Sequence, residues 1–133
     1  MMMNPIYSLN DKTSVSVSFN NHGKTFNVEV KAWKLTPTKW AWNVYVHIFD
    51  GHRLFESNEA ILDLPLHGGV TFDESSSSEC LNGDLRRLCK TVGCHYMHMR
   101  LQDDYENCSP LDGIPQEIEM EAQGLFRKLE RSE

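Results

Sequence analysis

The residues whose types and spacing could do chemistry begin with a histidine that stands directly before two glycines. His67, Gly68 and Gly69 are consecutive in the 133-residue chain, and Thr71 follows them closely. Paired glycines allow the backbone a positive φ and let another group approach it closely. An imidazole and a hydroxyl beside such a bend can form a ligand seat, although a sharp corner in a β-sheet would contain the same residues.

A second histidine, His98, could reach the same place. If the strand after Gly69 pairs with a strand around Gly93, both imidazoles converge at one end of the sheet. Two histidines can hold a phosphate, or pass a proton between an attacking and a leaving oxygen, so we expect His67 and His98 to be catalytic. In the alternative interpretation, His67 caps the glycine corner and His98 packs as a satisfied polar residue. The residues expected to bind the ligand are Gly68, Gly69, Thr71, Asp103 and Tyr45.

Cysteines and histidines near residue 95 suggest a metal site as an alternative. Zinc is bound tetrahedrally by thiolate and imidazole ligands, and Cys94, His95 and His98 are close in the sequence, with Cys89 and Cys108 further away. Structural zinc sites usually show two closely spaced ligand pairs. If this segment is a strand, His95 and His98 point to opposite faces because their spacing is odd. We therefore expect no cofactor, with zinc as the alternative.

The charge balance points to a third kind of site, for a partner protein. Nineteen acidic and 13 basic residues give a net charge of −6, which disfavours direct binding to nucleic-acid phosphates and suits a basic protein. The acidic loop 102–106, the helix residues 117–121 or an exposed tryptophan could form the interface. The alternatives are that the acidic charge maintains solubility and that the three tryptophans, Trp33, Trp40 and Trp42, belong to the core.

Alternating apolar residues predict three strands that would position these groups. In 13–19 and 25–33 every second residue is apolar, and the stretch 20–23 between them is typical of a turn. The stretch 39–49 is rich in aromatic and β-branched residues on both faces, so we expect a central third strand there. Together the three strands predict an antiparallel meander.

The middle of the chain has a less regular pattern. Residues 1–10 are predicted to be a flexible lead-in, and the Ser-rich stretch 73–80 a mobile loop. Asn82 or Asp84 could cap a short helix, and a further strand is expected at 91–101.

Residues 115–131 predict one amphipathic helix. Proline suits its first position, and acidic residues come early and basic residues late, as the helix dipole favours. The predicted apolar stripe consists of Ile118, Ala122, Leu125, Phe126 and Leu129. We therefore expect one α+β domain over 1–133, an antiparallel sheet of about four to five strands with the C-terminal helix packed on one face.

Length and composition also indicate a compartment. No apolar run approaches the roughly 20 residues that cross a bilayer, and the first residues lack the basic start and apolar core of a secretion signal. Without such a signal, the four cysteines are expected to be reduced thiols. We expect a cytoplasmic protein without membrane contacts, and a homo-oligomer is left open.

One stretch of the chain resembles a group of small hypothetical proteins from phages, prophages and bacteria. Residues 67–72 match their His-Gly-Gly-aliphatic-Thr-aromatic element, and a Gly- and His-containing element at 93–98 lies downstream. The resemblance covers residues 40–130. It implies an α+β fold and a phage or mobile-element setting, but no established activity. Relatives often carry an acidic residue where this chain has Cys94.

Two functional hypotheses follow from these residues and this setting. The first is a phage counter-defence protein, in the host cytoplasm, that binds or also cleaves a nucleotide-like molecule at His67, Thr71 and His98. The alternative is an anti-CRISPR-like inhibitor that docks on a host defence protein through an acidic surface. A small zinc-binding domain of structural role is the remaining alternative.

Overall fold

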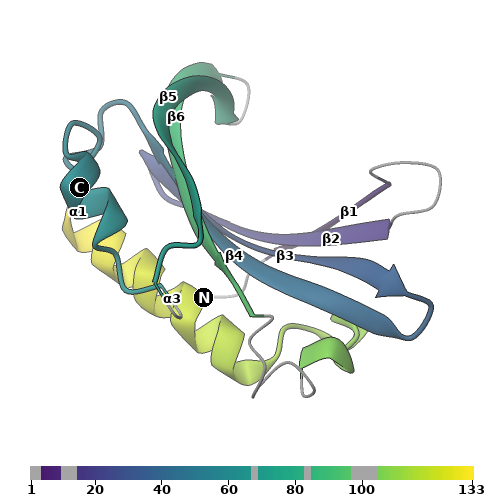
Figure 1. Ribbon diagram of the computed structural model, residues 1–133. Coiled ribbons are helices and arrows are strands. Elements are labelled where there is room, and N and C mark those ends of the chain that lie inside the picture. The colour runs from purple at the N-terminus through teal and green to yellow at the C-terminus, as the bar shows by residue number, and fades with distance from the viewer. Residues whose placement is uncertain (1–3, 10–14, 67–68, 83–84, 97–104) are drawn as a thin grey trace.

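The computed structural model describes residues 4–9, 15–66, 69–82, 85–96 and 105–133 (Figure 1). Four residues of the predicted site, His67, Gly68, His98 and Asp103, lie outside the described residues.

The described residues form one antiparallel sheet of six strands, in the order β1-β2-β3-β4-β6-β5. This confirms the α+β class with an antiparallel sheet and a C-terminal helix. The strands are β1 (Asn4–Leu9), β2 (Val15–His22), β3 (Phe26–Thr36), β4 (Lys39–Phe49), β5 (Phe72–Asn82) and β6 (Leu85–His95). The helical elements are α1 (Asn58–Leu62), the 3-10 helix η1 (Pro110–Asp112) and α3 (Gln116–Arg131).

The predicted meander of β2, β3 and β4 is confirmed, and β4 lies between β3 and β6 as a central strand. The turn from β2 to β3 requires glycine at position 23. A Cβ there would lie 2.2 Å from the Phe26 ring, and the Gly23 N–H donates to the Phe26 carbonyl at 2.8 Å. The period-two pattern therefore coincides with a turn that only a residue without a side chain can make.

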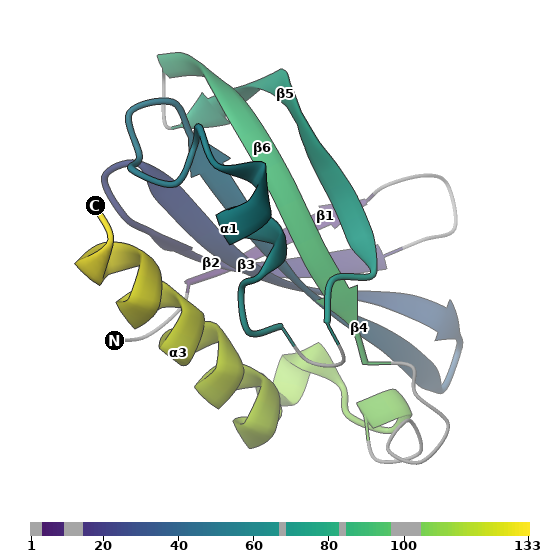
Figure 2. The same ribbon diagram turned by 60° about the vertical axis from the view of Figure 1, so that its left-hand side comes forward.

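Helix α3 covers one face of the sheet, which we call the core face. Its predicted apolar stripe is entirely buried, and the Phe126 ring lies 4.9 Å from the Phe26 ring of β3. Figures 1 and 2 show α1 on the same side of the sheet as α3. Trp40 and Trp42 are buried in the core, whereas Trp33 is only partly buried.

Two stretches predicted to be irregular are strands at opposite edges of the sheet, which is why it has six strands rather than four to five. Residues 4–9, inside the expected lead-in, form β1 and pair with β2. The Ser-rich stretch 73–80, expected to be a loop, lies within β5. An edge strand needs a hydrogen-bonded neighbour on only one side, so it forms without a strong hydrophobic pattern. The register of β5 shifts between Glu74 and Ser78.

The short helix expected after Asn82 or Asp84 is also wrong, because Leu85 already begins β6. This strand starts well before the predicted residue 91. Pairing with both β4 and β5 explains the difference, since tertiary ladder partners override a local helical pattern. Among the described residues, no helix has the length and apolar character needed to span a bilayer.

Candidate functional site

The face of the sheet opposite α3 carries no helix among the described residues (Figures 1 and 2). We call it the open face. Residues on it alternate with buried core-face residues along each strand, and the ladder registers align them into cross-strand rows. Its members around the centre are Glu29, Lys31, Asn43, Tyr45, His47, Phe72, Glu74, Thr91, Gly93 and His95.

A chain of hydrogen bonds crosses three strands of this face. His47 of β4 contacts Glu29 of β3 through Nε2, at 2.9 Å from Oε1, and Thr91 of β6 through Nδ1, at 2.8 Å from Oγ1. Because a carboxylate only accepts, Nε2 carries a hydrogen. In neutral His47, Nδ1 therefore accepts the Thr91 hydroxyl hydrogen. The His47 and Glu29 side chains are 21% and 20% exposed, so the chain is partly shielded from water.

The electrostatics of Glu29 follow from these contacts. Burial alone would raise the pKa of its carboxyl, but hydrogen bonds from His47 and Ser18, with the positive charges of His47 and Lys31, outweigh burial and lower the pKa. Glu29 is therefore an anion at neutral pH.

Beside this chain, two aromatic rings meet above a glycine. Tyr45 and Phe72 are both register partners of Gly93, and their ring centroids lie 5.4 Å apart, edge to face. Asn43 donates to the Tyr45 hydroxyl at 2.8 Å. Burial, and then the Glu29 charge, raise the pKa of Tyr45, so its phenol keeps its proton at neutral pH. Phe72 remains 37% exposed and offers an apolar surface to a ligand.

The expected pairing after Gly69 is confirmed in the structure. Phe72 pairs with Gly93, and the Thr71 N–H donates to the Gly93 carbonyl at 2.9 Å. Thr71 and Tyr45 are thus brought to either side of Gly93, as the predicted site requires. Gly69 is exposed and has a φ of +84°, the left-handed region that favours glycine.

The zinc hypothesis gains no support from the described ligands. Cys94 lies on the core face, where its Sγ donates to Glu121 Oε1 at 3.5 Å, whereas His95 pairs with Asn43 on the open face. In the part of the chain that the structure describes, no group of three metal-ligating side chains could hold an ion.

The acidic helix residues are used inside the molecule. The Tyr96 hydroxyl donates to Glu121 and the Tyr105 hydroxyl to Glu117, and the two tyrosine rings contact each other edge to face. Burial and the Glu121 carboxylate raise the pKa of Tyr96. Because two of its carboxylates hold tyrosines, the start of α3 is a poor candidate for an acidic docking surface.

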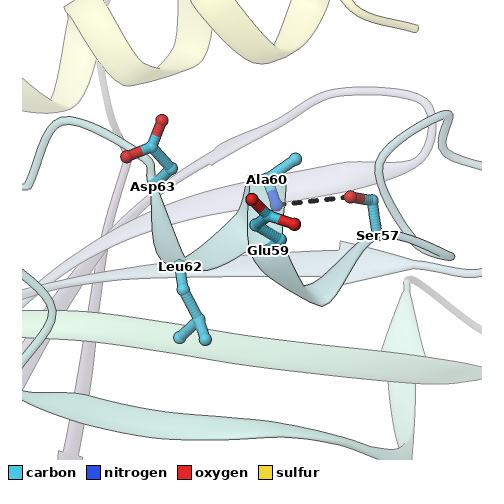
Figure 3. Close-up of a pocket in the computed structure, with 5 residues that line it drawn as sticks. All are labelled: Ser57, Glu59, Ala60, Leu62 and Asp63. Carbon is cyan, nitrogen blue, oxygen red and sulfur yellow. Dashed lines mark hydrogen bonds between the residues drawn. The ribbon is translucent and has the colours of Figure 1, made fainter.

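Two surface hollows lie away from the open face. One is lined by Ser57, Glu59, Ala60, Leu62 and Asp63 around α1. Figure 3 shows the Leu62 side chain pointing away from the two carboxylates, and the Ser57 hydroxyl accepts from the Ala60 N–H at 3.3 Å.

The other hollow separates β2 from α3, with the Phe126 ring, Asn21 and Gln123 beside the charged residues Arg127 and Glu130. Neither hollow includes a residue of the predicted site.

The carboxylate–imidazole–hydroxyl chain resembles the arrangement that activates a nucleophile. Acyl transfer also needs free N–H donors for the developing oxyanion. The central strands β4 and β6 use their backbone N–H groups in ladders with neighbours on both sides. The geometry therefore favours binding over nucleophilic catalysis.

Sequence reasoning missed Glu29, His47 and Thr91 as a site. The available signal was their shared parity within the predicted strands, which places Glu29 and His47 away from the apolar face. No protein-family model, curated protein or solved structure matches the chain.

Proposed function

We propose that the protein is an interaction protein whose open face docks on a basic segment of a partner protein. In the phage counter-defence setting implied by the sequence resemblance, docking would inhibit a host defence protein by occupying its basic surface. The observation that carries the proposal is the uncovered sheet face on which carboxylates flank a pair of aromatic rings. Lysine and arginine side chains bind carboxylates through charge-assisted hydrogen bonds and pack on aromatic faces.

The charged groups of the open face favour a cationic partner. Glu74 is exposed and lies opposite Thr91 in the ladder, while Glu29 lies on the other side of His47. Lys31 offsets part of this charge because it lies close to Glu29. The protein as a whole carries a net charge of −6, so long-range attraction also favours a basic partner.

The shape of the face supports a macromolecular partner. Small molecules are usually enclosed by concave pockets, and both described hollows lie elsewhere on the molecule. Phe72 and Tyr45 are aromatic residues of the kind that anchor protein interfaces. The acidic surface of the alternative hypothesis is thereby moved from the helix residues 117–121 to the open face.

Charge reversal at Glu74 tests the proposal directly. Binding of an Arg- and Lys-rich peptide would be measured by fluorescence anisotropy at low and at physiological salt. We expect Glu74→Lys to weaken binding about tenfold, because a like charge then faces the peptide. Binding of the wild-type protein should weaken with added salt.

The matched control is Glu130→Lys, which makes the same change in net charge at an exposed position of α3. We expect it to bind the peptide nearly as well as wild type. Equal losses in the two variants would show that only net charge matters, and would contradict docking at the open face. A Phe72→Ser variant should also weaken binding while retaining the fold.

A ligand site for a nucleotide-like molecule, bound or also cleaved at His67 and His98, is the second candidate function. It is favoured by the hydrogen bond from Thr71 to Gly93, which brings the chain after Gly69 beside Tyr45. Calorimetry with cyclic nucleotides should then show binding that His67→Ala abolishes without unfolding the protein. Absence of binding to wild type would exclude the nucleotides used.

A further inference from the structure

The hydrogen-bond chain through His47 can accept either protonation state of the imidazole. In neutral His47, Nε2–H donates to Glu29 and Nδ1 accepts from Thr91, as described above. In protonated His47, Nδ1–H donates to Thr91 Oγ1 instead. The Thr91 hydroxyl can then turn to the Cys89 sulfur, 3.5 Å away. No polar atom of the chain loses its partner when the proton is added, so the network is suited to titration.

The charges around His47 determine what its proton would do. On β3 it faces Glu29, with Lys31 beyond it and the uncharged Asn27 opposite. Tyr45 is its neighbour on β4, and Cys89 and Thr91 face it from β6. Glu74 lies beyond Thr91 on β5. More distant titratable groups on the same face are His22 and His95.

Adding a proton to His47 removes the excess negative charge of the open face. With neutral His47, the nearby charges are those of Glu29, Glu74 and Lys31. With charged His47, two cations balance two carboxylates. Imidazole is the side chain whose charge ordinarily changes between about pH 5 and pH 8.

We propose that protonation of His47 weakens the docking of a basic partner on the open face, so that the Glu29–His47–Thr91 chain is a pH-sensitive switch. This inference rests on the proposed docking function.

The switch can first be measured in the free protein. The ring nitrogen shifts of His47 would be followed by NMR between about pH 8 and pH 5. We expect both nitrogens to report one protonation step while the backbone signals of β3, β4 and β6 stay in place. A His47 ring that keeps one protonation state throughout would overturn the switch.

The second measurement compares binding of the Arg- and Lys-rich peptide at the two ends of this pH range. We expect the wild-type affinity to fall about fivefold on acidification as attraction to the face is lost. His47→Gln should bind equally at both pH values, and His95→Gln should behave like wild type. A pH response that persists in His47→Gln overturns the proposal.

Failure of docking and failure of the switch give different results. Peptide binding that is unchanged with pH in wild type overturns the switch and leaves docking intact. Absence of binding at both pH values overturns docking, and with it this regulation.

Thr91→Val provides a second variant if His47→Gln does not fold. It removes the acceptor for the Nδ1–H of charged His47, so the loss of affinity should move to lower pH. An unchanged response in this variant would also overturn the proposed chain.

Discussion

Tyr45 and Gly93 are register partners on β4 and β6, and the tyrosine ring occupies the space in which a side chain at position 93 would stand. A Cβ at Gly93 would lie 2.6 Å from Tyr45 Cδ1 and 2.8 Å from the Val44 carbonyl oxygen. The ring could move aside, but the carbonyl belongs to a central strand. Gly93 therefore maintains both the ladder and the aromatic pair of the open face.

We expect Gly93→Ala to destabilise the protein by about 1–3 kcal/mol, the usual cost of overpacking. It should also displace Tyr45 from Phe72, which near-ultraviolet circular dichroism would detect. The free energy of unfolding would be measured with urea.

Gly124→Ala is the control, because a Cβ in this helical position meets nothing within 4 Å. It should stabilise the protein by about 0.5–1 kcal/mol through its better helix propensity. Equal stability of Gly93→Ala and wild type would contradict the crowding at Tyr45.

Glu29 should make stability depend on acid pH. Its pKa is lowered in the folded state, below its ordinary value of 4.5. Its contribution is therefore present above that value and is lost as the pH falls through the folded pKa. Glu29→Gln should lose about 1–3 kcal/mol at neutral pH, as hydrogen bonds to charged groups do. The difference from wild type should shrink on acidification. A difference that is constant from neutral to acid pH would argue against the ionic contact.

Two tyrosine-to-phenylalanine substitutions should differ in their effects. Tyr96 is 3% exposed and donates to Glu121, a partly buried carboxylate that also accepts from Cys94. Tyr96→Phe should cost about 1–3 kcal/mol because this carboxylate loses a donor away from water. Tyr105→Phe should cost less, since its acceptor Glu117 is exposed and water can replace the hydroxyl. Thermal unfolding of both variants would rank them, and the reverse order would refute this account.

His52 should be essential to the end of α3. It is 3% exposed, its Nε2 lies 3.0 Å from the Leu129 carbonyl oxygen, and its Nδ1 accepts from the Leu54 N–H. His52→Ala should cost about 2–4 kcal/mol, because buried backbone groups lose their partners. Hydrogen exchange should become faster in the last turns of α3. His22→Ala, at an exposed position, should change stability by less than about 0.5 kcal/mol.

Much of the fold could be predicted from local pattern. The period-two alternation of 15–49 requires strands with one buried face, and a one-residue error would move every apolar side chain into water. The stripe of α3 is equally restrictive, because only a helix places Ile118, Ala122 and Leu125 on one side. The edge strands β1 and β5 lacked such a pattern and could not be recognised.

The candidate site shows the same division. The composition of the stretch after His67 predicted a pairing with the strand around Gly93, and the tertiary structure has that pairing. The catalytic roles of His67 and His98 stay predictions, because both residues lie outside the described part of the chain.

By itself, the sequence determined which segments alternate or coil and which face of each must be buried, since that information resides in neighbouring residues. Only the tertiary structure decided that β6 inserts between β4 and β5. That insertion places Thr91 on a histidine 44 residues away, while Glu29 reaches the same ring across 18 residues. Contacts of this kind depend on strand order and register, which backbone hydrogen bonding and the packing of the whole core select together.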